Sequence, residues 1–157
     1  MSRADLDEAL RLIADNADAA DFEGNKPESL ILSAEEALGL DFPPSYREFL
    51  GHLGCGDIAG AEFYGIITDP IADEGVPNTV WLTLDERASA GLPRELILVA
   101  DTGDGGYYAL DTSQRSSAGE CPIVLLDPHS EGDKNGRTLV AEDFGAFLLG
   151  QVREALE

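Results

Sequence analysis

Residues 39–66 read GLDFPPSYREFLGHLGCGDIAGAEFYGI, and this stretch does most to decide the fold. Its proline pair, Pro43-Pro44, cannot lie inside a helix but suits the first helical turn. Apolar residues then recur at helical spacing until Gly54, so a short amphipathic helix is predicted to end there. The residues expected on its buried face are Tyr46, Phe49, Leu50 and Leu53.

Two short extended segments are predicted to follow that helix. One includes Ile58, the other spans residues 62–67, and Ala59-Gly60-Ala61 turns between them. The stretch contains no nucleophile paired with a base and no phosphate-binding loop. It therefore predicts an arrangement of a helix against a sheet, and it does not predict a catalytic centre.

Two helices are predicted before this stretch. The first begins at Ser2, which can cap it with Asp5 at the third helical position. Residues 20–29 break the pattern and are expected to form a loop. The second helix is expected to start at the capping-box signature Ser33-Ala-Glu-Glu36 and to close at Gly39. The apolar stripe of the first helix is predicted to be Leu6, Leu10, Ile13 and Ala17.

A fourth helix is predicted after a loop at residues 68–77. Asn78 is expected to cap it, and it reaches to about Ala90 before Gly91. The side chains expected to point inward from it are Trp81, Leu84 and Ala88.

The hydrophobic period then changes to that of strands. Leu96-Ile-Leu-Val-Ala100 is a compact apolar run, typical of a buried central strand. Asp101-Thr-Gly-Asp-Gly-Gly106 is predicted to be a hairpin turn, because glycine accepts the positive φ that such turns need. Residues 107–111 are then the returning strand, and residues 122–126 form another strand after a polar loop.

A long charged loop at residues 127–136 leads into a final amphipathic helix. No repeat, low-complexity tract or linker divides the chain, so residues 1–157 are predicted to form one domain. Its class is α+β, with a mixed, mainly antiparallel sheet packed by N-terminal, central and C-terminal helices. The final helix is predicted to bury Phe144, Phe147, Leu148 and Val152.

The composition is that of a globular protein with a real core. The chain has 157 residues, of which 43% are hydrophobic. Its charged, periodic beginning does not read as a signal peptide, and no apolar run approaches the roughly 20 residues needed to cross a bilayer. Cys55 and Cys121 lack close spacing, so we expect reduced thiols in a cytoplasmic protein.

The net charge of −21 bears on the choice of partner. Thirty-one carboxylates oppose ten basic groups, so the potential repels phosphate backbones and anionic lipid heads. We therefore expect neither nucleic acid nor a membrane surface as a partner, and a basic protein fits best. The alternative is that the acidity is a property of the whole proteome, and the sequence leaves both open.

The ordered set of motifs resembles the SUKH superfamily, which includes bacterial toxin-immunity proteins and fungal regulators of cell-wall synthesis. The resemblance extends over nearly the whole chain in the order of its elements. The motifs that carry it are Leu38-Gly39, Pro43-Pro44-x-Tyr46-x-x-Phe49-Leu50, Gly54-x-Gly56-x-Ile58, Tyr64-Gly65, Leu92-Pro93, Gly103-Asp104-Gly105 and Phe144-x-x-Phe147-Leu148.

The resemblance implies a protein that works by binding. It implies an immunity protein that neutralises a cognate bacterial toxin, with no catalytic residues and no cofactor to transfer. An intracellular scaffold or regulatory module of the same fold is the alternative. The sequence does not set the oligomeric state.

Acids on predicted turns and loops are the candidates for contact with a basic partner. An outward tyrosine of the adjacent pair Tyr107-Tyr108 is a candidate anchor, because tyrosine is enriched at interfaces. The candidate acids are Asp57, Glu62, Asp73, Glu74, Asp104, Glu131 and Asp133.

A small metal-binding or hydrolytic protein is a remote alternative. His52, Cys55, Cys121 and His129 are the right ligand types for zinc, but no close Cys-x-x-Cys-like pair is present. A cysteine–histidine nucleophilic pair would need the fold to bring these residues together. We therefore predict no bound metal and no enzyme activity.

Overall fold

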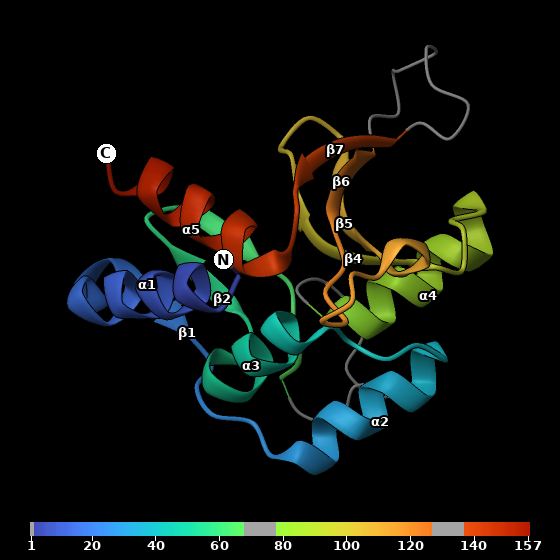
Figure 1. Ribbon diagram of the computed structural model, residues 1–157, viewed down its shortest axis with the longest axis horizontal. Coiled ribbons are helices and arrows are strands. Elements are labelled where there is room, and N and C mark those ends of the chain that lie inside the picture. The colour runs from blue at the N-terminus through green and yellow to red at the C-terminus, as the bar shows by residue number, and fades with distance from the viewer. Residues whose placement is uncertain (1, 68–77, 127–136) are drawn as a thin grey trace.

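A computed structural model describes residues 2–67, 78–126 and 137–157 of the chain (Figure 1). The elements in these ranges are α1 (Ser2–Asp15), a 3₁₀ turn (Ala17–Ala19), β1 (Ala20–Phe22), α2 (Glu28–Leu38), α3 (Pro44–Leu53), β2 (Gly56–Ile58), β3 (Ala61–Phe63), α4 (Thr79–Ala90), β4 (Leu96–Asp101), β5 (Tyr107–Asp111), a second 3₁₀ turn (Thr112–Gln114), β6 (Ile123–Leu126), β7 (Arg137–Ala141) and α5 (Phe144–Ala155).

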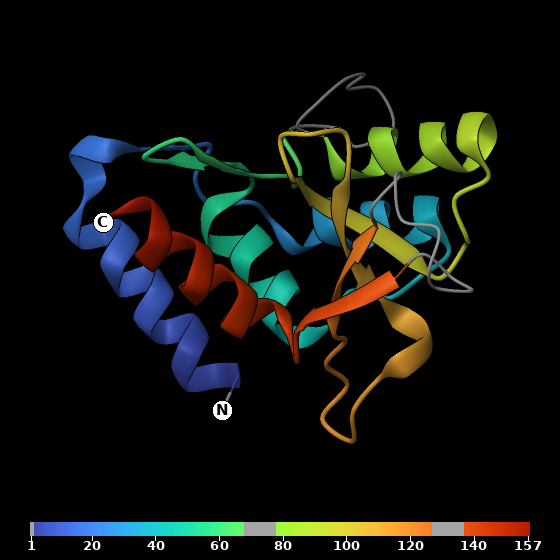
Figure 2. The same ribbon diagram turned by 90° about the horizontal axis from the view of Figure 1, so that it is seen from above.

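The described strands form two antiparallel sheets, with the orders β1-β2-β3 and β4-β5-β6-β7. The sheets meet where the Tyr64 amide donates to the Val99 carbonyl, at 2.7 Å. Helices α1 and α5 lie side by side at one end of the molecule, and α4 packs beside β4 (Figures 1 and 2). The predicted α+β class is confirmed, although the strands divide between two sheets instead of forming one.

The core is built around α3, as residues 39–66 predict. Tyr46, Phe49 and Leu50 are buried, and Leu53 is half-buried. The rings of Tyr46 and Phe144 have centroids 4.8 Å apart, and the Tyr46 hydroxyl donates to the Tyr64 carbonyl at 2.7 Å. Aromatic packing therefore joins α3 to α5, and one hydrogen bond joins it to the segment after β3. The four predicted core residues of α5 are all buried.

The start of α3 is capped from a distant segment. Pro43 occupies the N-cap position and supplies no side-chain hydrogen bond. The Glu120 carboxylate takes that role, accepting from the Ser45 amide at 3.0 Å and from the Ser45 hydroxyl at 2.8 Å. This contact ties the loop before β6 to the helix.

Three predictions near the N-terminus are wrong. Helix α2 begins at Glu28 after the extended residue Pro27, and Ser33 lies in its interior. Proline suits a helix start, so it sets the boundary ahead of the capping-box pattern. Part of the predicted loop 20–29 is the strand β1, and Ala17 is exposed in a 3₁₀ turn beyond α1.

Asn78 caps α4 as predicted, accepting from the Val80 and Trp81 amides. Of the residues predicted to point inward, Trp81 is half-buried and packs against a buried cluster that includes Leu98, as expected. The prediction is wrong for the other two, because Leu84 is 37% exposed and Ala88 is also exposed. The buried face instead includes Thr79 and Thr83. The Thr79 hydroxyl donates to the Leu98 carbonyl at 2.5 Å, and the Leu98 amide donates to Thr83 Oγ1 at 3.2 Å.

These threonines explain a further correction. The strand predicted to be central, β4, lies at the edge of its sheet. Threonine hydroxyls of α4 satisfy backbone groups at that edge, so a helix covers it in place of another strand. On the opposite edge, β7 was not predicted at all. The hairpin turn at residues 101–106 is confirmed, with the Thr102 amide donating to the Gly106 carbonyl at 3.1 Å.

Candidate functional site: an acidic partner-binding face

A row of three carboxylates crosses the smaller sheet. Asp21 on β1 is in register with Asp57 on β2, and Asp57 is in register with Glu62 on β3. Because side chains alternate along a strand, all three project from the same face. The opposite face packs Ile58 and Phe63 into the core. Burial of the apolar residues therefore fixes the row of acids on the outside.

The row continues onto the larger sheet at Asp101, the last residue of β4. Burial raises the pKa of Glu62, and the charges of Asp101 and Asp57 raise it further. Two like charges therefore act on Glu62 from β4 and from β2. This arrangement concentrates negative potential where the two sheets meet.

Acids of α4 extend the same surface around Tyr107. The pKa of Tyr107 is raised, and burial is the largest cause. The charges of Glu86, Asp101 and Asp85 raise this pKa further, as does a hydrogen bond with Glu86. Figure 2 shows the β1-β2-β3 sheet, the β4–β5 turn and α4 along one side of the molecule. We call this side the acidic face, consisting of Asp21, Asp57, Glu62, Asp85, Glu86 and Asp101.

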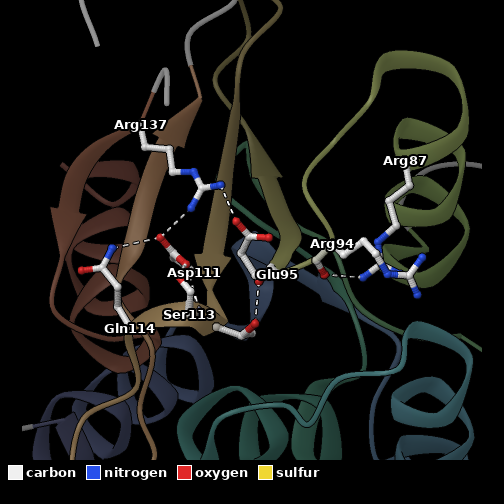
Figure 3. Close-up of polar contacts among 8 residues, drawn as sticks. Arg87, Arg94, Glu95, Asp111, Ser113, Gln114 and Arg137 are labelled. Carbon is white, nitrogen blue, oxygen red and sulfur yellow. Dashed lines mark hydrogen bonds and ion pairs between the residues drawn. The ribbon is translucent and has the colours of Figure 1, made fainter. Parts of the chain in front are cut away.

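No acid of the acidic face forms an ion pair with a basic group in residues 2–67, 78–126 or 137–157. The nearest cation along α4, Arg87, is directed elsewhere. Its guanidinium donates to the Leu38 carbonyl at 2.9 Å and to the Arg94 carbonyl at 2.8 Å, and Figure 3 shows the second of these bonds. Within the described parts of the chain, no ion pair therefore offsets the negative charge of this face.

A cavity of about 290 Å³ opens beside the β4–β5 turn. The Tyr64 hydroxyl donates to Asp101 Oδ2 at 2.9 Å, and the Gly103 amide donates to Asp101 Oδ1 at 3.0 Å. The carboxylate of Asp101 is therefore held in one orientation at the cavity. The residues lining it are Tyr64, Asp101, Gly103, Gly105, Gly106 and Tyr107.

A larger hollow of about 570 Å³ lies between α2 and α3. The guanidinium of Arg47, which lines it, is already bound to carboxylates of the fold. Arg47 donates to Glu28 at 2.6 Å, and two of its nitrogens donate to Glu35, at 3.1 Å and 3.0 Å. These bonds satisfy Arg47 within the fold. The Arg47 guanidinium is therefore not available to a ligand in the hollow.

A second ion network, also in Figure 3, is structural. Arg137 on β7 donates to Asp111 at 3.0 Å and to Glu95 at 2.7 Å. The Asp111 side chain is fully buried, and burial by itself raises the pKa of its carboxyl group. Hydrogen bonds from Ser113 and Gln114, together with the charge of Arg137, outweigh burial, so the pKa is lowered overall. The network ties β7 to β5 and to the segment before β4.

The predicted contact residues are partly brought together. Asp57 and Glu62 are adjacent members of the acidic face, and Asp104 lies in the β4–β5 turn between Gly103 and Gly105. The sequence reasoning missed Asp21, Asp85, Glu86 and Asp101. The apolar-polar-apolar pattern of Ala20-Asp21-Phe22 is that of a strand with one solvent-exposed face, and it could have predicted that Asp21 points outward. The candidates that lie outside the described residues are Asp73, Glu74, Glu131 and Asp133.

The outward tyrosine of the predicted pair is not fully exposed. Tyr108 packs against the Phe147 ring, with centroids 5.0 Å apart, and Tyr107 packs against the α4 side of the sheet. Both are half-buried. Tyr107 also lines the cavity, so of the two it is the one that an interface could reach.

The thiols are placed for packing. Cys55 and Cys121 are buried and free, and burial raises the pKa of each to about 11. Both thiols are therefore protonated at neutral pH. His52 is exposed on α3, where Glu48 lies 3.7 Å away, and His129 lies outside the described residues. Among the residues with described positions, no group of three or more His, Cys, Asp or Glu could hold a metal ion.

Comparison with known protein families gives one finding. The model of the SUKH_5 family, described as SMI1-KNR4 cell-wall, matches residues 7–152. This range contains every strand and helix of the described fold except the first residues of α1 and the last of α5. Within the described parts of the chain, no helix is long and apolar enough to cross a membrane.

Proposed function

Since this chain belongs to the SUKH superfamily, we propose that it is an immunity protein that binds and neutralises a cognate bacterial toxin domain in the cytoplasm. Proteins of this family generally bind protein partners and are generally non-catalytic. The observation that carries the proposal is the acidic face, six carboxylates from five elements with no ion-paired cation among the described residues. A basic toxin domain is the partner whose charge complements it.

The acidic face suits fast recognition. A surface of one sign steers an oppositely charged protein and can raise the association rate by about 10 to 10³-fold at low salt. An immunity protein must reach its toxin before the toxin acts, so a fast association rate has a direct functional value. The partner's basic active-site surface would then be covered by the acids and by Tyr107.

The direct test uses the proteins encoded beside this chain's gene. Each is expressed with and without this chain, and growth and complex formation by size-exclusion chromatography are measured. We expect one of them to arrest growth alone, and we expect co-expression to restore growth and yield a complex. If no neighbouring product binds while several unrelated cellular proteins do, the scaffold alternative replaces this proposal.

Matched charge variants test the surface. Asp57→Asn with Glu62→Gln removes two charges from the acidic face, and we expect the association rate to fall by about threefold to tenfold. Glu36→Gln with Glu154→Gln removes the same charge from exposed positions on α2 and α5. Equal effects of the two pairs on the association rate would mean that net charge alone attracts the partner.

A further inference from the structure

The cavity beside the β4–β5 turn combines one fixed carboxylate with an aromatic wall. Its lining supplies the carboxylate of Asp101, the rings of Tyr64 and Tyr107, and three glycines, with no cation. We infer that it receives an arginine side chain of the protein partner, with the guanidinium on Asp101 and against the Tyr107 ring. This inference rests on the proposed function and names the partner group that the acidic face anchors.

The carboxylate of Asp101 can accept two further hydrogen bonds from one bidentate donor. Each of its carboxylate oxygens already accepts one hydrogen bond inside the fold, one from Tyr64 and one from Gly103. A carboxylate oxygen has two acceptor sites, so one remains on each oxygen. The planar fork of a guanidinium matches two parallel acceptors, and the carboxylate loses little freedom because it is already held.

Tyr107 supplies the second contact. The ring is half-buried on β5 and packs against the core beneath α4. Asp85, Glu86 and Asp101 lie close enough for their negative charges to act on Tyr107. A cation over a tyrosine face is attracted to the ring, and a guanidinium can also stack on it. These two contacts favour arginine over lysine.

The glycines of the β4–β5 turn leave the entrance of the cavity accessible to solvent. Gly103 and Gly105 have φ values of +86° and +97°, which only glycine adopts easily. A Cβ atom at Gly103 would meet nothing within 4 Å. The turn conformation therefore demands glycine, and as a result no side chain of these two residues stands between solvent and Asp101.

The test is a titration of the full chain with N-acetyl-arginine amide, followed by NMR. We expect weak, saturable shifts at the amides of Gly103, Gly105 and Gly106, with a smaller response to N-acetyl-lysine amide. N-acetyl-citrulline amide has nearly the same shape without charge, and we expect no binding. Absence of saturable shifts at these three amides, or equal binding of the citrulline probe, overturns the inference.

Three variants sharpen the test. Asp101→Asn keeps an acceptor for Gly103, and the Tyr64 hydroxyl can turn to accept from the new amide; we expect at least about tenfold weaker arginine binding. Tyr107→Phe keeps the ring and should bind within twofold of the wild type, whereas Tyr107→Leu should bind about fivefold more weakly. Glu36→Gln is the matched charge control and should change nothing.

Measurement with the protein partner separates the two proposals. We expect Asp101→Asn to weaken the complex at least about tenfold, mainly through faster dissociation. If the partner binds Asp101→Asn within twofold of the wild type, the arginine anchor is wrong and the proposed function stands. If no partner binds the wild type, the proposed function is wrong, and the glycine-amide titration independently reports on the cavity.

Discussion

Asp111 and Glu62 are both carboxylates on strands, but the fold treats them in opposite ways. Asp111 is buried with the guanidinium of Arg137 at 3.0 Å, and its pKa is lowered. Glu62 is exposed beside Asp57 and Asp101, and its pKa is raised. In one region charge is neutralised to hold strands together, and in the other like charges are assembled at a cost to stability. The proposed partner-binding role of the acidic face would account for this difference.

Arg137→Met should have the largest effect on this comparison. It leaves Asp111 buried without its cation, and removing one partner of a buried pair destabilises a fold by about 3 kcal/mol. Urea unfolding measures the loss. Adding Asp111→Asn should recover part of the lost stability, because the amide keeps an acceptor for Ser113 and carries no charge.

The control is Arg11→Met, which removes an exposed arginine with two ion pairs and should change stability by less than about 0.5 kcal/mol. A loss for Arg137→Met no larger than this control would contradict the structural role of the network.

Glu120→Ala should have an intermediate effect. It removes the acceptor of the Ser45 amide at the start of α3, and loss of a helix cap typically costs about 1 kcal/mol. Glu36→Ala, at an exposed position inside α2, is the control and should be close to neutral. Chemical unfolding compares the two, and an equal effect would show that Glu120 does not act as a cap.

Features that depend on residues close together in the sequence could be predicted, and features that depend on distant residues could not. The boundaries of α3 and the burial of Tyr46 and Phe49 follow from residues within one helix, so periodicity and proline placement were enough. The cap from Glu120 joins residues 75 positions apart, and no local pattern signals it. The buried face of α4 was predicted only in part, for a related reason. Thr79 and Thr83 are buried because they bond the edge of β4, and a hydrophobicity pattern assigns threonine to the surface.

The acidic face was predictable only in part. Asp57 and Glu62 follow from their place around a glycine-bearing turn. Asp101 begins a turn whose hairpin was predicted, but its proximity to Glu62 depends on how the two sheets meet. The abundance of acids in the chain made any single acid uninformative until the register of β1, β2 and β3 aligned three of them.

Glu62→Gln should have the smallest effect and the opposite sign to the two substitutions above. The charged form of Glu62 is disfavoured by partial desolvation of its carboxylate and by the charges of Asp101 and Asp57. Because Glu62 is exposed, solvent screening limits the gain on neutralisation to about 0.3 kcal/mol at pH 7.

The pH dependence of this gain follows from the raised pKa. A carboxyl whose pKa is higher in the folded state adds stability when protonated, and that stability is lost as the pH rises through the folded pKa. The advantage of Glu62→Gln over the wild type should therefore shrink as the pH falls from 7 toward 4.5, the ordinary pKa of a glutamate side chain. Thermal unfolding at a series of pH values measures the difference. A constant difference across this range would mean that Glu62 does not feel its acidic neighbours, and the acidic face would then be a set of independent, solvated charges.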